Sequence, residues 1–255
     1  MIVDRCEECG ATIEAPDRDA LGDAWVAHVR SVHADWPFPD VAIRNYADAG
    51  ERLTGPTERL DTIGDVVIHP VTEDRLDDWL AFFDHDAFAD NRAWAACYCF
   101  EPHGHPKGVP PEEAENHGWR DNREAMIDLL RSGKSFGYLA YVDGRPAGWV
   151  NASKRSEYAL YRMGEGADPA DTDVVGVSCF VIAPPYRRHG LAAKLLDRVV
   201  ADAAGRGAEW VEAYPSKAPR PDDASHFRGP RALLDEFGFD PVAEEERHLV
   251  VRKPV

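Results

Sequence analysis

The 255-residue sequence has no apolar run of about 18 residues, so we expect no membrane-spanning helix. Its first residues, MIVDRCEECG, lack the basic and apolar regions of a secretory signal. Cysteines are few and odd in number, five in all, which does not suit a disulfide framework. Together these absences predict a cytoplasmic protein with no membrane partner and with free or metal-bound thiols.

Positive charge is also scarce. The chain has 29 Lys and Arg residues against 46 Asp and Glu residues, which gives a formal net charge of −17. A protein that binds nucleic acid in bulk needs a basic face to neutralise phosphates, so nucleic acid is not an expected partner. An acidic surface attracts a cationic acceptor such as an amine, although it also serves solubility alone.

The first 36 residues contain a metal-ligand pattern. Four potential ligands follow the spacing C-x2-C-x18-H-x4-H: Cys6, Cys9, His28 and His33. Two thiolates and two imidazoles are a set that Zn²⁺ takes in tetrahedral geometry. A segment this short cannot bury enough apolar surface to fold alone, so residues 1–36 predict a structural, zinc-finger-like module suited to docking a protein partner. Free thiols and surface histidines are the alternative interpretation.

The histidine spacing makes a further prediction about the helix that carries both residues, expected from about Asp19. Five helical residues turn about 140° more than one full turn. For both imidazoles to face one metal, the final helical turn must therefore loosen or tighten. Arg30 is the only strongly basic residue between Asp19 and His33, which argues against DNA reading by this module.

The rest of the chain is predicted to hold a connector and one larger α+β domain. Residues 37–64 read as a helical connector bounded by proline and glycine. From residue 65 to residue 255 the hydrophobic pattern predicts a strand, two helices, a hairpin, a strand, a helix, a strand, a helix and a strand. The pair Asp143-Gly144 is a strong signal for the tight turn of that hairpin.

The stretch 178–196, SCFVIAPPYRRHGLAAKLL, predicts a strand, a sharp turn and a helix. The first amides of a helix have no internal partner and carry the positive end of its dipole. Arg187 and Arg188 add positive charge there, and Gly190 removes the Cβ that would hold an anion away from the backbone. We therefore expect a phosphate site at this turn. The alternative is a plain helix start with incidental arginines.

The motif Arg187-x-x-Gly190-x-Ala192 after a strand resembles the acetyl-CoA signature of the GNAT superfamily of N-acetyltransferases. The predicted element order over residues 65–255 is similar to the GNAT fold, a mixed, mostly antiparallel sheet flanked by helices with splayed central strands. The resemblance implies acetyl-CoA as cosubstrate, with Phe180, Val181 and Ile182 along its pantetheine arm. It also implies that the pyrophosphate is held by the following loop: Arg187, Arg188, His189, Gly190, Leu191 and Ala192.

What the resemblance implies about catalysis is direct transfer of the acetyl group to a primary amine. Many relatives have a tyrosine as general acid where this chain has Leu234. Tyr214 is a substitute acid and Glu212 a base or acceptor anchor, with core packing and an ion pair as the respective alternatives. The missing tyrosine also allows a rival function, a non-catalytic acyl-CoA sensor that docks a partner through its zinc module.

The segment Trp94-Ala-Ala-Cys97-Tyr-Cys99 resembles a bacterial GNAT group of undefined acceptor. In the family this region borders the acceptor pocket, which implies substrate contacts for Trp94, Tyr98 and His103. Two other interpretations stay open: a second metal site and plain loop packing. The metal ligands would be Cys97, Cys99, His103 and His105. Cys179 is expected to be a buried strand residue rather than a nucleophile that carries the acyl group.

Overall fold

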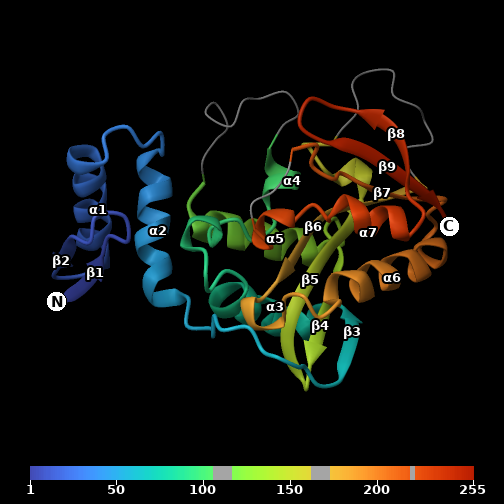
Figure 1. Cartoon of the computed structure of the whole chain (residues 1–255), viewed down its shortest axis with the longest axis horizontal. Coiled ribbons are helices and arrows are strands. Elements are labelled where there is room, and N and C mark those ends of the chain that lie inside the picture. The colour runs from blue at the N-terminus through green and yellow to red at the C-terminus, as the bar shows by residue number, and fades with distance from the viewer. Residues whose placement is uncertain (106–116, 162–172, 219–221) are drawn as a thin grey trace.

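The computed structural model describes residues 1–105, 117–161, 173–218 and 222–255. A small unit at the N-terminal end stands beside a larger α+β body that ends at the C-terminus (Figure 1). Within the described residues, none of the helices combines the length and hydrophobicity that crossing a bilayer requires.

The N-terminal unit is a hairpin followed by a helix. Strands β1 (Ile2–Arg5) and β2 (Thr12–Ala15) pair antiparallel, and α1 (Arg18–Val32) packs on them. Asp17 caps α1 by accepting a hydrogen bond from the Ala20 amide at 2.9 Å. The helix thus begins close to the predicted residue, and it carries an apolar stripe around Trp25 into the small core.

Helix α2 (Asp40–Arg52) falls within the predicted connector, but it also completes the core of the N-terminal unit. Its residues Ile43 and Ala47 are buried against Trp25 and Val29 of α1. Its last residue, Arg52, reaches the larger body, where it donates to the carbonyl oxygens of residues 83, 84 and 95. One helix therefore packs against both units.

The larger body is built on a seven-stranded sheet in the order β3-β4-β5-β6-β7-β9-β8. Every neighbouring pair is antiparallel except β6 and β7. The strands are β3 (Val66–Pro70), β4 (Gly137–Val142), β5 (Arg145–Lys154), β6 (Val174–Ile182), β7 (Trp210–Ala213), β8 (Asp240–Glu244) and β9 (Leu249–Pro254). The β4–β5 turn has φ of 49° at Asp143 and 81° at Gly144, as the predicted tight hairpin requires. Strand β8 was not predicted.

Strands β6 and β7 pair over only four residues each. The register runs from Val174 opposite Trp210 to Val177 opposite Ala213, where β7 ends. Strand β6 continues to Ile182 with β5 on one side only. The two central strands therefore splay, as the resemblance implies, and leave the edge of residues 178–182 without a β7 partner.

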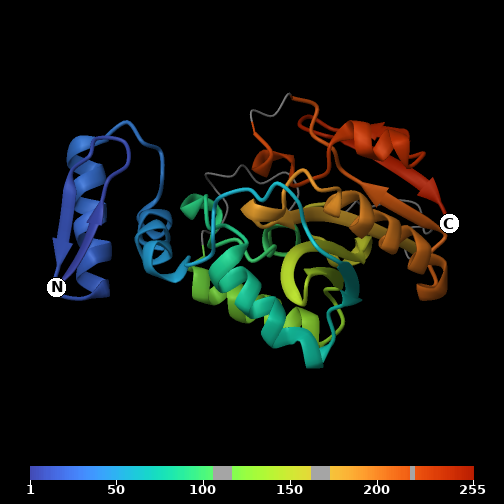
Figure 2. The ribbon, with the colours of Figure 1, turned by 60° about the horizontal axis from the view of Figure 1, so that its bottom comes forward.

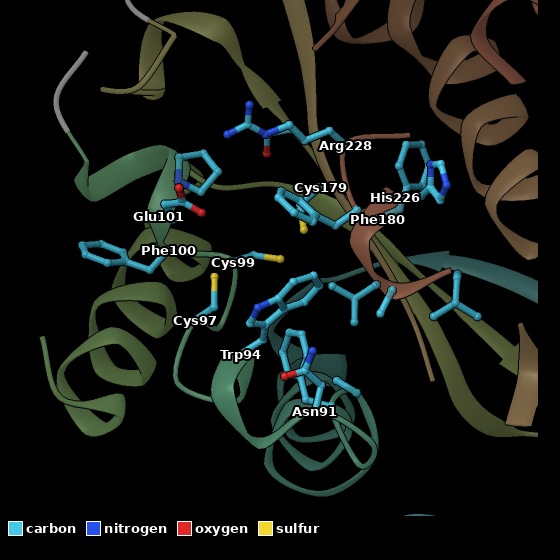
Figure 3. Close-up of a pocket in the computed structure, with 18 of the residues that line it drawn as sticks. Asn91, Trp94, Cys97, Cys99, Phe100, Glu101, Cys179, Phe180, His226 and Arg228 are labelled. Atoms are coloured by element: carbon cyan, nitrogen blue, oxygen red, sulfur yellow. The ribbon is translucent and has the colours of Figure 1, made fainter. Parts of the chain in front are cut away.

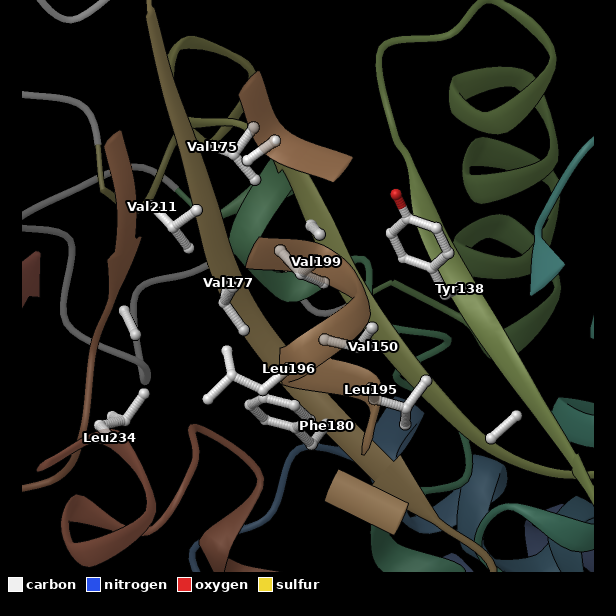
Figure 4. Packing of buried hydrophobic residues seen from close by; sticks show 14 of the residues in the cluster. Tyr138, Val150, Val175, Val177, Phe180, Leu195, Leu196, Val199, Val211 and Leu234 are labelled. Atoms are coloured by element: carbon white, nitrogen blue, oxygen red, sulfur yellow. The ribbon is translucent and has the colours of Figure 1, made fainter. Parts of the chain in front are cut away.

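Helices cover both faces of the sheet (Figure 2). Helix α6 (Leu191–Ala203) lies on one face, where Leu195, Leu196 and Val199 are buried against β4, β5 and β6 (Figure 4). Helices α3 (Leu76–Ala81) and α5 (Trp119–Arg131) pack on the other face around Trp79 and Trp149. Two short helices complete the body, α4 (Glu101–Gly104) and α7 (Arg231–Glu236). This layering places the splayed part of β6 between two hydrophobic cores.

Candidate active site and metal centre

The four predicted metal ligands come together. The Sγ of Cys6 lies 3.4 Å from Nε2 of His33, and the Sγ of Cys9 lies 3.5 Å from Nε2 of His28. All four ligand atoms lie within 4.8 Å of one another. With Zn–S bonds of about 2.3 Å and Zn–N bonds of about 2.0–2.1 Å, a tetrahedral site has S···N edges of about 3.5 Å. The two measured distances match that edge.

Local backbone geometry sets these ligands in place. The Cys6 amide donates to Ala11 O at 2.9 Å, and Gly10, at φ 74°, donates to Cys6 O at 2.8 Å, which closes the turn that presents the two thiols. His33 lies one residue beyond α1 with φ −122° and ψ 47°, so it has left the helical path, as its spacing from His28 predicts.

The second metal interpretation is wrong. Among the residues that the structure describes, Cys6, Cys9, His28 and His33 form the only cluster suited to a metal ion, so Cys97, Cys99, His103 and His105 do not converge. His103 instead forms two partly buried hydrogen bonds: its Nδ1 lies 3.1 Å from Glu157 O and its Nε2 lies 3.2 Å from Nδ2 of Asn151. Burial lowers the pKa of His103 to about 4, so the ring is neutral near pH 7.

A cavity of about 930 Å³ opens beside the splayed strand. It begins at the turn before α6, follows residues 178–182 of β6, and reaches Trp94 and α4 (Figure 3). Ala42 and Asn45 of α2 line it too, so the helix shared with the N-terminal unit forms part of its wall. Of the nine residues predicted to hold acetyl-CoA, eight line this cavity; the exception is His189.

The turn before α6 presents free backbone donors. Gly190 precedes the helix at φ 76°, a left-handed conformation that glycine adopts without strain. No acceptor among the described residues takes a hydrogen bond from the amides of Gly190, Leu191 or Ala192. A Cβ placed on Gly190 would meet nothing within 4 Å, so the space before these amides is open. This is the geometry of an anion site at a helix N-terminus.

The basic side chains of the turn form hydrogen bonds and ion pairs with other residues of the protein. Arg187 donates to Ile182 O at 3.0 Å and pairs with Asp90 at 2.5 and 2.9 Å. Arg188 is exposed and lies 3.4 Å from Asp223, and Nε2 of His189 lies 2.9 Å from Leu60 O. The sequence predicted phosphate contacts for all three side chains. In the structure Arg187 instead ties the end of β6 to the turn.

The open edge of β6 keeps part of its hydrogen-bonding capacity. The Ala183 amide donates to Ala147 O, so by alternation the amide of Ile182 faces away from β5, and no described residue accepts from it. The Phe180 amide also faces this edge, but it donates to Phe227 O at 2.5 Å. Phe180 can therefore line a bound pantetheine with its side chain and not with its amide.

The two predicted catalytic residues lie outside the cavity lining. Glu212 is buried between two guanidinium groups, 3.1 Å from Arg155 and 2.5 Å from Arg252. Tyr214 is buried with its ring stacked on Tyr161 at 3.6 Å between centroids. Burial, reinforced by Glu212, raises the pKa of Tyr214 well above 10.0, which makes its hydroxyl a poorer acid. Both residues match the alternatives weighed for them, an ion pair and core packing.

The segment after Trp94 places two cysteines in the cavity wall. Tyr98 and Cys99 have φ of 46° and 57°, a rare left-handed pair for residues with side chains. Tyr98 is fully buried and donates to Asp84 at 2.5 Å, so it fixes the bend instead of contacting a substrate as predicted. Trp94, in contrast, lines the cavity with its ring edge-on to Phe227.

Burial favours the protonated form of two cavity thiols, those of Cys97 and Cys99. Cys97, Cys99 and Cys179 all line the cavity. Burial raises the pKa of Cys97 to about 12 and that of Cys99 well above its ordinary value. A thiol that is not ionised near pH 7 is a weak nucleophile, so a cysteine-bound acyl intermediate is disfavoured.

Sequence reasoning missed two charged residues at the end of the cavity near α4. Glu101 at the start of α4 and Arg228 in the loop before α7 both line the cavity. They are separated by more than a hundred residues and belong to no recognisable motif, so only the fold brings them to one cavity. Leu234, at the family's usual tyrosine position, lies on α7 with its side chain fully buried in the hydrophobic core, and it does not line the cavity.

Comparison with known families gives one match. Residues 94–219, about half of the chain, match the family described as "Acetyltransferase (GNAT) family". No curated protein matches the chain. The matched residues include the segment after Trp94, the splayed strand β6 and the turn before α6.

Several solved structures resemble the chain distantly. An N-acetyltransferase from Staphylococcus aureus Mu50 is 14% identical, covers 75% of this chain and 99% of its own, and has a TM-score of 0.47. The GNAT domain of S. lividans PAT is 15% identical, covers 75% and 92%, and has a TM-score of 0.48. The Salmonella typhimurium yncA structure, a putative acetyltransferase with its cofactor acetyl-CoA, is 15% identical, covers 74% and 93%, and has a TM-score of 0.44. Similarity at this level carries no argument about individual residues.

Proposed function

Since residues 94–219 form an acetyltransferase domain of the GNAT family, we propose that the chain transfers an acetyl group from acetyl-CoA directly to a primary amine of a small molecule or protein. The observation that carries the proposal is the junction of two features in one cavity. The unpaired amides before α6 form an anion site, and the splayed edge of β6 leads from it to the acceptor end. A pyrophosphate, a pantetheine arm and a thioester fit this sequence of surfaces in that order.

Each group of cavity-lining residues would contact a different part of acetyl-CoA, according to its position. The amides of Gly190, Leu191 and Ala192 would hold the pyrophosphate, where the helix dipole favours negative charge. The Ile182 amide faces the same edge and would donate to the pantetheine arm or the thioester carbonyl. Holding thioester and amine at one place contributes several kcal/mol to lowering the barrier.

The reaction is balanced without an enzyme-bound acyl group. The ammonium loses one proton to a base at the acceptor end, where Glu101 is the carboxylate within the cavity lining. The amine nitrogen then bonds to the carbonyl carbon, the C–S bond breaks, and the thiolate of CoA takes up the second proton. The raised pKa values of Cys97 and Cys99 favour this direct route over transfer through cysteine.

The decisive experiment combines binding with turnover. Calorimetry with the full chain should detect acetyl-CoA and CoA at concentrations near about 1 mM or below, and mass spectrometry should detect acetylated amine from a primary-amine panel. Absence of binding would refute the proposed cofactor site. Binding without any acetylated product would assign the chain to the sensor class instead.

For the N-terminal unit we propose a structural zinc ion held by Cys6, Cys9, His28 and His33. The matched S···N distances and the chemistry of the donor set support it. The ion would join the hairpin to α1, and α1 in turn packs on α2, whose Ala42 and Asn45 line the cavity. The zinc module would thus support one wall of the acceptor end, besides any role in docking a protein partner.

A further inference from the structure

Arg228 is a cavity-lining arginine that has no ion-pair partner among the described residues. Its Nε is fully buried and forms no hydrogen bond with any described residue. Its guanidinium carbon lies 5.9 Å from the ring centre of Tyr161 and 5.6 Å from that of Phe227, so aromatic rings flank it. A buried donor without an acceptor costs stability, which a bound anion would recover.

The other charges of the cavity cancel in pairs. Arg187 is paired with Asp90, and Arg188 lies against Asp223. Among the described acidic and arginine side chains that line the cavity, Glu101 and Arg228 are left without an ion-pair partner. In Figure 3 the Arg228 side chain extends from its loop in the direction of Glu101. The acceptor end therefore offers one negative and one positive group to a ligand.

Arg228 stands away from the phosphate end. The ring of Tyr161, under its guanidinium, stacks on Tyr214, whose hydroxyl oxygen would lie 2.9 Å from a Cβ placed on Gly176. The carbonyl of Phe227, one residue before Arg228, accepts from the Phe180 amide, so the Arg228 backbone lies beside β6 near Phe180. Its side chain extends away from Phe180 in the direction of Glu101 (Figure 3), whereas the turn that would hold the pyrophosphate follows Ile182.

From this placement we infer that the amine acceptor also carries a carboxylate, which Arg228 binds while Glu101 faces the ammonium group. The inference rests on the proposed acetyltransferase function and narrows its acceptor to amino acids and similar zwitterions. The planar guanidinium matches a carboxylate with two parallel hydrogen bonds. The rings of Tyr161 and Phe227 flank it and Trp94 lines the same cavity, which suits an uncharged side chain or stem between the two charged groups.

The test uses matched acceptors that differ only in the carboxylate. Three pairs serve: phenylalanine and phenethylamine, leucine and isoamylamine, lysine and cadaverine. For the full-length protein with acetyl-CoA, kcat/KM should be about 10- to 100-fold higher for the amino acid of each pair, the range expected for a charged hydrogen-bonded contact. Arg228→Gln should remove that preference and leave the affinity for acetyl-CoA unchanged.

Arg231→Gln is the control, because Arg231 is the next arginine of the same chain segment and is paired with Asp235 outside the cavity lining. It should keep the preference. Equal rates within each pair for the wild-type protein, or an equal loss on all six acceptors in Arg228→Gln, would overturn the inference while the acetyltransferase function stood.

Two further arms separate the remaining outcomes. Calorimetry of the CoA complex should show tighter binding of N-acetylphenylalanine than of N-acetylphenethylamine, with the difference lost in Arg228→Gln. That result without turnover would support the carboxylate site and refute the proposed function. The acyl group is the other source of a carboxylate: a tenfold or larger preference for succinyl-CoA over acetyl-CoA that Arg228→Gln removes would overturn the acceptor assignment.

Discussion

Arg92 joins the two parts of the molecule through Asp4. Its Nη1 lies 3.2 and 3.0 Å from the two carboxylate oxygens of Asp4, which belongs to the first strand of the N-terminal unit. Asp4 also accepts a hydrogen bond from Nε1 of Trp25, in the core of that unit. Arg92 directly precedes the cavity-lining residues Ala93 and Trp94, so this ion pair connects the N-terminal unit to the cavity wall.

The Asp4–Arg92 pair should be energetically coupled. Both side chains are largely buried, and charged hydrogen bonds that are shielded from water contribute about 1.5–3 kcal/mol. A double-mutant cycle with Asp4→Asn and Arg92→Gln, read by urea unfolding of the zinc-loaded protein, should give a coupling in that range. The exposed pair Arg30–Asp40 is the control and should couple by less than about 1 kcal/mol. Equal coupling in the two cycles would contradict the interpretation.

Metal analysis should find about one zinc per chain. The double substitution Cys6→Ser, Cys9→Ser should abolish retention of the ion, because serine hydroxyls do not replace two thiolates at a tetrahedral S2N2 site. Cys97→Ser, Cys99→Ser is the matched control and should retain the ion, since those thiols lie in the cavity wall. Full zinc retention in the first variant would refute the ligand set.

Gly190→Glu should strongly weaken acetyl-CoA binding. The new carboxylate would stand in the open space before the unpaired amides, where it repels a pyrophosphate, and affinity measured by calorimetry should fall about tenfold or more. Gly207→Glu is the control, because Gly207 has a similar φ of 80° and equally open surroundings at the other end of α6. Both variants incur a similar left-handed backbone cost of about 1–2 kcal/mol. Equal binding by both variants would contradict the phosphate site.

Glu212→Gln should affect stability much more than catalysis. Glu212 compensates the buried guanidinium of Arg155 and the partly buried one of Arg252, and breaking a buried pair by removing one partner costs about 3–5 kcal/mol. Per folded molecule, kcat should be little changed, whereas Glu101→Gln should lower kcat/KM with little effect on unfolding. Chemical denaturation and steady-state rates distinguish the two variants. A stable but inactive Glu212→Gln protein would restore the catalytic interpretation of this residue.

His103 should make the folded state sensitive to mild acid. Burial lowers its pKa from an ordinary 6.5 to about 4, so on lowering the pH the unfolded chain takes up the proton first. Stability contributed by the neutral ring is therefore complete above pH 6.5 and is lost progressively as the pH falls toward 4. The loss amounts to about 3 kcal/mol.

Urea unfolding at a series of pH values measures this effect. His103→Gln should flatten the stability profile between pH 6.5 and 4, because the titrating group is gone. His69→Gln, a half-buried histidine of strand β3, should leave the slope in place. An unchanged slope in His103→Gln would assign the acid sensitivity to other groups.

Local sequence signals predict three features of this protein. The spacing of Cys6, Cys9, His28 and His33 predicts a metal cluster, because a knuckle and one helix suffice to bring the four together. Asp143-Gly144 predicts the hairpin turn through its positive φ angles. The motif around Gly190 predicts the turn before α6 because bare amides at a helix start follow from backbone geometry alone.

Long-range partnerships could not be predicted in the same way. The sequence shows Arg187 beside a helix start, but only the fold brings Asp90 against it from 97 residues away. Glu212 and Tyr214 alternate correctly along a strand, yet the face that they share turns into a buried network and not into the cavity. Strand β8 was missed because its burial pattern is exposed throughout and gives no apolar alternation.

The sequence by itself determined the metal-ligand spacing, the element order of the larger body apart from β8, and the turn before α6, because each depends on residues that are close along the chain. Tertiary structure alone decided which charges remain unpaired beside the cavity. Glu101 and Arg228 are 127 positions apart by their numbers, and pairing elsewhere removes their competitors. Electrostatic complementarity to an acceptor depends on distances through space, and those exist only once the sheet has splayed and the loops have closed around it.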